Sequence, residues 1–375
     1  MSAAARRDRL GRVEGLLASL LSAEENPTPA GCSAAPTQLH DFACRVWPSY
    51  RPGRVHEYVA GRLDEFLVAC EREESPRLLL TMPPRHGKSL LASVFLPAFA
   101  LGRNPDWPVI HASHTADLSH DFSRQVRNLL PEAEYQACFP GVLPACDSRA
   151  VDRWGIEGRR GVFVSVGVGG PLTGRGARLL IIDDPLKNAQ EADSETYRRA
   201  QADWFHSTAY TRLERGAGIL LCMTRWSPDD LGGLVAGGAA GFDPDVEEWE
   251  VVNLPAIADG GSRGDALGRE PGTALWPEKF DSAALERIER RLPPRWWLAL
   301  YQQQPAAPGG SLLEVDRIRQ GRPDPATLSV YQAWDLAIST KAGADYTAAA
   351  TLGVDGNQDI YLLDVTRGQI GRAHV

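Results

Sequence analysis

The residues with the clearest chemical potential lie between positions 78 and 89, in the stretch LLLTMPPRHGKS. An apolar run, 78–82, leads into a short loop that ends in Gly87, Lys88 and Ser89, and an apolar helical pattern begins at once. Backbone N–H groups at a helix N-terminus, a glycine and a lysine bind nucleotide phosphates, and a serine hydroxyl holds Mg²⁺. We therefore expect ATP and Mg²⁺ to be bound by the residues of this loop: Pro84, Arg85, His86, Gly87, Lys88 and Ser89.

This loop departs from the usual pattern G-x-x-x-x-G-K-[ST], because Met82 stands where the first glycine would be. An ordinary strand-to-helix turn is the alternative interpretation of so short a motif. The apolar run before it and the helical pattern after it favour the nucleotide site.

A second group of chemical residues follows another apolar run, in ARLLIIDDP. We expect Asp183 to hold Mg²⁺, directly or through water, and Asp184 to orient or deprotonate the attacking water. A turn at the strand end is the alternative, since Asp-Asp-Pro suits turns. Two carboxylates at a buried strand end repel one another unless a cation lies beside them, which favours the metal site.

A third strand end carries Thr224 and Arg225, in CMTRWSPDDLGG. At the edge of an α/β sheet where ligands bind, a hydroxyl group there can sense the γ-phosphate. A helix-capping turn at 227–229 with a structural arginine fits equally, and both can hold at once. Just upstream of the acidic strand, Arg175 and Arg178 lie in a glycine-rich segment that either presents an arginine to phosphate or DNA, or is a flexible surface loop.

The elements that must position these residues follow from the apolar pattern. Continuously apolar runs separated by helical stretches are typical of buried parallel strands. Six such runs occur, at 78–82, 109–112, 162–166, 179–182, 219–223 and, more weakly, 250–254. With a predicted helix at 54–73, they indicate an α/β fold, a P-loop NTPase with a doubly wound parallel sheet across about 54–256.

Residues after 256 change in character. A glycine-rich loop, a charged helix at 281–291 and the polar stretch YQQQPAAPGG form a connecting segment. A strand-rich module begins near Leu328, where Asp355 and Gly356 separate two apolar alternating segments as a hairpin turn would. With fewer than 50 residues, this module is too short to fold alone.

Composition limits the classes of protein. The chain has 375 residues, a formal charge of −8, 43% hydrophobic and 23% charged residues, which excludes wholesale disorder and a globally basic DNA coat. No apolar run approaches the roughly 20 residues of a membrane-spanning helix. Six scattered cysteines without metal-ligand spacing predict reduced thiols, so we expect a cytoplasmic protein that is not secreted.

Two terminal segments are set apart. Residues 1–37 are expected to form an amphipathic N-terminal helix and a linker rich in Pro, Ala and Thr. The last seven residues, QIGRAHV at 369–375, match the translation of a common sequencing-library adapter. We expect them to be an assembly artefact that interrupts the gene within the second module.

Taken together and in order, MPPRHGKS, GRGARLLIIDDPLKNAQEADS, CMTRWSPDDLGG, LWPEKF and ALYQQQPAAPGG resemble the large terminase subunit of tailed bacteriophages. The resemblance covers about residues 40–367. It implies an N-terminal ATPase motor that packages viral double-stranded DNA into a procapsid, and a C-terminal RNase H-like nuclease that cuts the concatemer. It also implies roles for Lys88 and Ser89 at the nucleotide, Asp183 and Asp184 at the metal and water, and Thr224 and Arg225 in coupling.

The resemblance further implies a domain order of ATPase (38–256), linker or connecting subdomain (257–325) and incomplete RNase H-like nuclease (326–368). Asp335 would be a carboxylate shared by two divalent ions, Mg²⁺ or Mn²⁺, and Asp345 would join or support that site. Asp364 is either a further ligand or a solvated residue. The implied partners are double-stranded DNA, a portal protein and a small terminase subunit, in a homo-oligomeric ring on the procapsid in the host bacterial cytoplasm, with no membrane.

Two other functions remain open. A helicase or transposition ATPase would share the nucleotide site, but a helicase predicts a second RecA-like domain where this chain has a strand pair with Asp335. A non-catalytic DNA-binding scaffold would not need Lys88, Ser89, Asp183 and Asp184 together.

Overall fold

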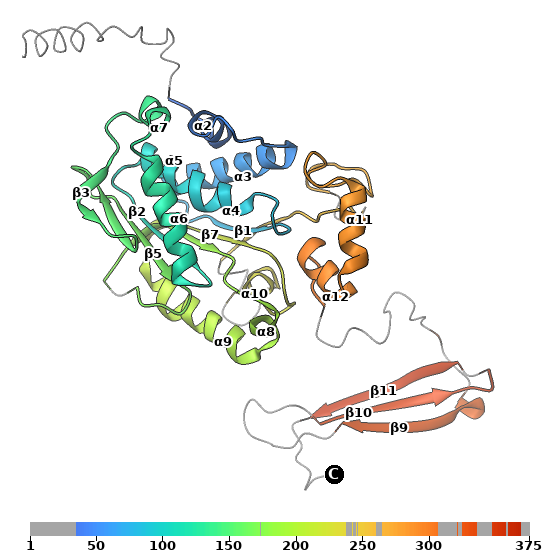
Figure 1. Cartoon of the computed structure of the whole chain (residues 1–375). Coiled ribbons are helices and arrows are strands. Elements are labelled where there is room, and N and C mark those ends of the chain that lie inside the picture. Colours follow the sequence, from blue (N-terminus) through green and yellow to red (C-terminus); the bar gives the residue numbers. More distant parts are fainter. Residues whose placement is uncertain are drawn as a thin grey trace, which may run out of the picture. The chain divides into compact units, whose positions relative to one another are not determined.

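The computed structural model describes residues 35–172, 174–237, 242, 245, 247–259, 265–306, 321, 325–335, 347–357 and 359–368. The chain divides into two compact units, residues 1–310 and 311–375 (Figure 1). The predicted N-terminal helix and the segment 369–375 lie outside the described residues. Within the described residues, no helix has the length and apolar character needed to cross a membrane.

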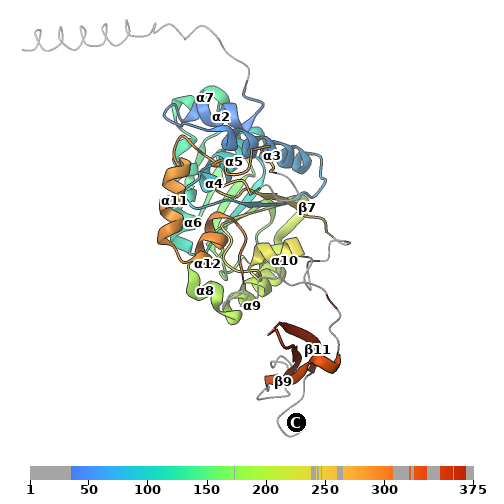
Figure 2. The ribbon, with the colours of Figure 1, turned by 90° about the vertical axis from the view of Figure 1, so that its right-hand side faces the viewer.

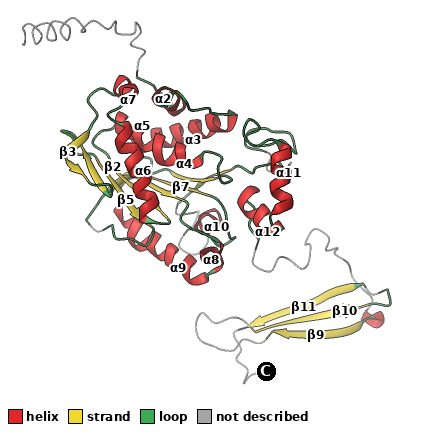
Figure 3. Cartoon of the chain, in the orientation of Figure 1, coloured by secondary structure: helices red, strands yellow, loops and turns green. Residues whose placement is uncertain are grey.

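The first unit is built on a β-sheet to which the described residues contribute eight strands (Figure 3). These are β1 (Arg77–Thr81), β2 (Pro108–Ser113), β3 (Pro144–Arg149), β4 (Arg153–Ile156), β5 (Val162–Gly167), β6 (Ala177–Asp183), β7 (Leu213–Met223) and β8 (Glu250–Asn253). Their order is β3-β4-β5-β2-β6-β7-β1-β8. The six strands β5, β2, β6, β7, β1 and β8 run parallel to one another. The six predicted runs are therefore the six parallel strands, and the α/β fold is confirmed.

Both faces of this sheet are buried, because alternate residues of the central strands enter different apolar clusters. In β6, Leu179 and Ile181 belong to one cluster, whereas Leu180 and Ile182 belong to the other. Strands buried on both faces are continuously apolar, which explains the runs in the sequence.

Helices cover the two faces (Figures 1 and 2). The first cluster contains residues of α2 (Leu39–Val46), α3 (Arg54–Glu71), α5 (Leu96–Arg103), α6 (Ala116–Leu129) and α7 (Ala133–Cys138). The second contains residues of α9 (Glu195–Trp204) and α10 (Leu231–Gly237), and the short helix α8 (Ala189–Asp193) precedes α9. The predicted helix at 54–73 is α3, which buries the expected face through Val59, Leu63 and Leu67.

Strands β3 and β4 were not expected from the sequence. They pair antiparallel with one another, and β4 pairs antiparallel with β5 at the sheet edge. Only alternate residues of β4 are buried, Trp154 and Ile156, so the segment has no continuous apolar run.

The connecting segment contains α11 (Ser282–Arg291), α12 (Pro294–Trp296) and a π-helical turn, η4 (Trp297–Tyr301). Asp281 caps α11, since its carboxylate accepts the N–H of Ala284 at 2.7 Å, and this confirms the charged helix expected at 281–291. The segment has its own small core, formed by Ala256, Ala274, Leu285 and Trp297.

The second unit is a three-stranded antiparallel sheet in its described part. A 3₁₀ turn, η6 (Pro325–Thr327), precedes β9 (Ser329–Asp335), β10 (Thr347–Val354) and β11 (Ile360–Gly368), in the order β11-β10-β9. The hairpin turn at Asp355 is present, because its carboxylate accepts the N–H groups of Asn357 and Asp359. The finer domain boundaries at 37, 256 and 325 remain predictions.

Candidate nucleotide-binding site

The predicted phosphate loop joins β1 to a continuous helical stretch of α4 (Lys88–Leu90), the π-helical turn η1 (Leu91–Phe95) and α5. Two loop residues have left-handed backbone, Arg85 with φ of 65° and Gly87 with φ of 89°. Glycine adopts this conformation readily, whereas other residues pay about 1–2 kcal/mol. A Cβ on Gly87 would also lie 2.6 Å from Nε2 of His56, so this position needs glycine for two reasons.

The loop lysine and the acidic strand end meet at the carboxyl edge of the sheet. The Nζ of Lys88 donates to Oδ2 of Asp184, and the Lys88 side chain is almost fully buried. Burial opposes the charge on Lys88, but Asp184 and Asp183 together outweigh it and raise the pKa of this ammonium above its usual value. Lys88 is therefore a fixed positive charge at the base of the site.

Asp183 is the more deeply buried of the two carboxylates. Its Oδ1 accepts from Oγ of Ser89 at 3.2 Å, and its Oδ2 accepts from Oγ of Ser93 at 2.8 Å. Burial raises the pKa of Asp183 to about 6, although Lys88 opposes the shift. A carboxylate that is costly to ionise without a cation is suited to a metal site.

The pairing of Ser89 with Asp183 fits Mg²⁺. Mg²⁺ takes hard oxygen ligands and is commonly held by one or two protein groups together with phosphates and water. The described residues contain no cluster of three or more His, Cys, Asp or Glu side chains able to form an all-protein cage. Ser89 and Asp183 are thus two oxygen donors that could hold Mg²⁺.

Asp184 is held by backbone contacts at the end of β6. Its φ is 43°, its carbonyl accepts from the N–H and Nδ1 of His114, and its Oδ1 accepts from the N–H of Thr224 at 2.8 Å. A left-handed non-glycine residue persists only where neighbouring groups fix it. This arrangement presents a carboxylate to the cavity, where it can act on a water molecule.

Thr224 and Arg225, the third predicted pair, make different kinds of contact. The Thr224 hydroxyl donates to the carbonyl of Met82 at 3.2 Å, which ties the end of β7 to the start of the phosphate loop. The Arg225 guanidinium pairs with the buried Asp230 at 2.9 Å, and Asp230 also accepts from the N–H of Gly233. The helix cap expected at 227–229 is therefore Asp230, and Arg225 has the structural contact foreseen as the alternative.

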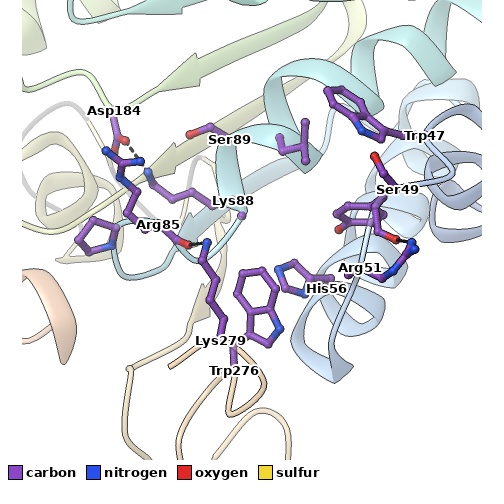
Figure 4. Close-up of a pocket in the computed structure, with 14 residues that line it drawn as sticks. Trp47, Ser49, Arg51, His56, Arg85, Lys88, Ser89, Asp184, Trp276 and Lys279 are labelled. Atoms are coloured by element: carbon purple, nitrogen blue, oxygen red, sulfur yellow. Dashed lines mark hydrogen bonds and ion pairs between the residues drawn. The ribbon is translucent and has the colours of Figure 1, made fainter. Parts of the chain in front are cut away.

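A cavity of about 690 Å³ opens beside these groups (Figure 4). Six lining residues were predicted, namely Pro84, Arg85, Gly87, Lys88, Ser89 and Asp184. Arg51 and Lys279 join Arg85 and Lys88 as cations around it, against the single carboxylate of Asp184. A concave site with this charge suits a polyanion such as a triphosphate.

The remaining eight lining residues were not predicted from the sequence. They are Trp47, Ser49, Tyr50, Arg51, His56, Leu90, Trp276 and Lys279. The first four lie between α2 and α3, in the aromatic and polar stretch WPSYR. That composition was a usable signal, but nothing in its spacing links it to a loop about 40 positions later.

Two predicted residues are placed differently from expectation. His86 does not line the cavity; it is fully buried, its Nδ1 contacts the Pro84 carbonyl at 2.9 Å, and burial lowers its pKa to about 4. Arg178 belongs to β6 and its guanidinium bonds the carbonyls of Cys70 and Arg215, so it is not presented on a loop. Arg175 is half-buried.

In the second unit, Asp335 is the last residue of β9 and is exposed. Asp345 lies outside the described residues. Asp335 pairs with Ala348 and Asp364 pairs with Thr351, three positions along the same strand. Because side chains alternate between faces, this register places Asp335 and Asp364 on opposite faces of the sheet, which argues against a shared metal.

Three solved structures of phage large terminases are similar to this chain. The HK97 bacteriophage large terminase has 14% identity and a TM-score of 0.47 over 88% of this chain and 66% of that chain. The large terminase of a thermophilic bacteriophage, solved in complex with ADP, has 10% identity and a TM-score of 0.41 over 82% and 67%. The ATPase domain of the Thermus phage P74-26 large terminase has 16% identity and a TM-score of 0.44 over 72% and 99%.

The chain thus spans about two thirds of the HK97 protein and of the protein solved with ADP. No curated protein matches it in sequence. Residues 79–318, well over half of the chain, match the family described as terminase large subunit, T4likevirus-type, N-terminal. This match begins at the strand before the phosphate loop and includes both acidic residues, Thr224 and the connecting segment, and it shows that the chain belongs to the terminase large subunits.

Proposed function

We propose that this chain hydrolyses ATP to drive viral double-stranded DNA into a procapsid. One observation carries the proposal: Lys88, Ser89, Asp183 and Asp184, from two separate segments, meet beside one cationic cavity. Phosphoryl transfer depends mainly on positioning and charge, and these four groups provide both.

The ion pair between Lys88 and Asp184 suggests how binding of ATP activates the site. Phosphate oxygens compete for the Lys88 ammonium, and when they take it the Asp184 carboxylate is released to orient and deprotonate the attacking water. Mg²⁺ held by Ser89 and Asp183 would neutralise charge on the transferred phosphoryl group. The N–H of Thr224 on Oδ1 keeps the Asp184 carboxylate oriented throughout.

The other end of the cavity suits a nucleoside. Trp47 and Tyr50 provide aromatic surface there, and the Arg51 guanidinium is fixed by the carbonyls of Pro48 and Tyr50. Flat aromatic surface beside a cation accepts a stacked base.

The hydrogen bond between Thr224 and Met82 would couple ATP hydrolysis to movement of DNA. A change at the phosphate loop reaches the end of β7 through this bond, and the Arg225 N–H in turn donates to Gln303 in the connecting segment. Thr224 is therefore a coupling residue, and Arg225 supports it structurally.

The nuclease activity, the two divalent ions and the roles of Asp335 and Asp345 are part of the same proposal, and they rest on the family. So do a ring of subunits on the procapsid, the portal protein, the small terminase subunit and a place in the host cytoplasm. A helicase or transposition ATPase is the second candidate, since the ATP site alone does not distinguish them.

The first experiment measures ATP hydrolysis by the full chain with and without double-stranded DNA. Lys88→Ala and Asp184→Asn test the site, and Lys187→Ala, an exposed lysine outside the cavity, is the matched control. We expect DNA-stimulated hydrolysis that both site variants lose by at least ~100-fold, while Lys187→Ala retains it.

Hydrolysis that survives Lys88→Ala would place the active site elsewhere. Hydrolysis stimulated by single-stranded but not double-stranded DNA would favour the helicase. Folded protein that neither binds nor hydrolyses ATP would favour a scaffold.

A further inference from the structure

The phosphate loop is held from outside the sheet at three successive contacts. The Arg85 carbonyl accepts from Nζ of Lys279 at 2.8 Å, and the His86 carbonyl contacts Nε2 of His56 at 3.0 Å. The His86 ring stacks on Phe280 with centroids 4.6 Å apart. The contacts come from α3 and from the segment 276–280. Lys279, in this segment, is 194 positions after Arg85 in the sequence.

The His56 tautomer is fixed by its other nitrogen. The N–H of Gly53 donates to Nδ1 at 2.8 Å, so the proton lies on Nε2 and His56 donates to the His86 carbonyl. The His56 ring is fully buried and packs edge-on against Trp276, with centroids 4.3 Å apart. His56 is thus a rigid donor.

The two anchored carbonyls determine where the neighbouring N–H groups point. In a planar trans peptide the C=O and N–H point in opposite directions. Holding the carbonyls of Arg85 and His86 on Lys279 and His56 therefore aims the N–H groups of His86 and Gly87 away from these side chains. In the part of the chain that the structure describes, neither N–H has an acceptor.

The backbone of this loop is strained, so it needs support from surrounding residues. Arg85 has a φ of 65°, a strained conformation for a non-glycine residue, and Met82 replaces a glycine. Strained backbone persists only where its surroundings over-determine it. A peptide flip in the loop would exchange an N–H donor for a carbonyl that repels phosphate.

We propose that His56 and Lys279 are positioning residues that hold the two loop carbonyls outward, so that the N–H groups of His86 and Gly87 form an anion hole for nucleotide phosphate. The inference rests on the proposed function, because it assigns a role at the same site. Trp276 contacts both donors, since it packs on His56 and the Lys279 ammonium lies 4.7 Å from the centre of its ring, while Phe280 stacks on His86.

The test measures the Kd of a ribose-labelled fluorescent ATP analogue with Mg²⁺ on the full chain. His56→Leu removes the donor, whereas His56→Gln keeps an N–H near the position of Nε2. We expect His56→Leu to weaken binding about tenfold and His56→Gln to restore most of it. Thermal unfolding of each variant shows whether it is folded at the assay temperature.

Lys279 gives a second, independent variant. It lies at the surface, so Lys279→Met is expected to fold even where His56→Leu does not. We expect Lys279→Met to raise the Kd about three- to tenfold, Lys279→Gln to raise it less because a donor remains, and Lys187→Met to leave it unchanged. Equal losses for Met and Gln would assign Lys279 a purely electrostatic role and overturn its positioning role.

The outcomes separate the two proposals. Binding by the wild type that Lys88→Ala abolishes, together with unchanged binding in folded His56→Leu and Lys279→Met, overturns the positioning role alone. Absence of binding by the wild type overturns both. A weakened Kd that His56→Gln rescues supports the inference, because a merely structural defect would lower stability without following the donor.

Discussion

Lys88 and Asp184, from two separate segments of the chain, form an ion pair at the base of the cavity. Asp183 lies beside it, fully buried, and the same ammonium stabilises its ionised form. The Lys88 ammonium therefore offsets the negative charge of two neighbouring carboxylates.

Removing the ammonium should destabilise the fold in a pH-dependent way. In Lys88→Met the pKa of Asp183 rises further above its value in the unfolded chain. A carboxyl group with a raised pKa contributes less stability as pH increases through that pKa. We expect a loss of about 2 kcal/mol at pH 8 and a smaller loss at pH 5.5, by urea unfolding. Equal losses at both pH values would show that the carboxylates do not depend on Lys88, and Lys187→Met is the control.

If Ser89 is a ligand of Mg²⁺, replacing it should change the Mg²⁺ requirement of ATP hydrolysis, whereas replacing the buried Ser123 should not. Ser89→Ala removes the hydroxyl that contacts Asp183, so we expect the Mg²⁺ concentration for half-maximal ATP hydrolysis to rise about tenfold or more. Ser123→Ala removes a buried hydroxyl that donates to the Val151 carbonyl and accepts from Nε1 of Trp154, and Ser123 does not line the cavity. That control should lose about 1 kcal/mol of stability with no change in Mg²⁺ requirement. A similar Mg²⁺ response in both variants would argue against Ser89 as a ligand.

Substitution by alanine should be harmful at Gly87 and stabilising at Gly61. Gly87→Ala places a Cβ 2.6 Å from His56 and forces alanine into a left-handed conformation, so nucleotide binding should be lost. Gly61 lies in α3, is exposed and has open space around it, so Gly61→Ala should stabilise the protein by about 0.5–1 kcal/mol. Nucleotide titration and thermal unfolding measure the two effects. Retained binding in Gly87→Ala would mean that the loop is less constrained than its contacts imply.

Acid should destabilise the first unit through a buried histidine that does not line the cavity. Burial lowers the pKa of His111 to about 3, below its ordinary value of about 6.5. The unfolded chain therefore takes up the proton first, and stability is lost progressively as pH falls below about 6.5. From pH 7 to 4.5 this contributes about 3 kcal/mol.

The variant His111→Asn checks this origin. Asparagine does not titrate, and its amide lies near Nδ1, which contacts Ser119 at 2.8 Å. We expect its free energy of unfolding to change less between pH 7 and 4.5 than that of the wild type. An unchanged acid response would assign the effect to other groups, with His86 the next to examine.

The sheet of the second unit should be a source of association. Tyr331 and Leu362 both pair with Leu352 in one cross-strand row, and they are 60% and 63% exposed. Exposed apolar rows of this kind bind hydrophobic dyes and other chains. The double variant Tyr331→Thr and Leu362→Thr should bind less of a hydrophobic dye and aggregate more slowly. Tyr197→Thr, which changes an exposed tyrosine of α9, should not, and equal effects would contradict the prediction.

The sequence predicted those parts of the fold that leave a local pattern. Continuously apolar runs identified the six parallel strands, since both faces of each central strand are buried. Strands β3 and β4 left no such pattern, because only one face of β4 is covered. The helix α2 was missed because its eight residues are too few to establish a period.

The same distinction applies to the site. Lys88 and Ser89 could be predicted because they end a short loop between an apolar strand and a helix, and Asp183 and Asp184 because they lie at the end of an apolar strand. Trp47, His56 and Lys279 could not, because their place beside the cavity depends on how distant segments pack. His86 shows the converse, since a residue inside the motif is buried against Phe280 and faces the core.

Contact between Lys279 and Arg85 has a consequence for the order of events during protein synthesis. The ribosome must add 194 further residues after Arg85 before Lys279 exists, which takes roughly 10–40 s at bacterial elongation rates. During this interval the nascent chain already carries the lysine, the serine and, later, both aspartates, but not every residue that holds the loop. If Lys279 positions the loop as proposed, we expect the nascent chain to reach its full nucleotide affinity only after the connecting segment has emerged.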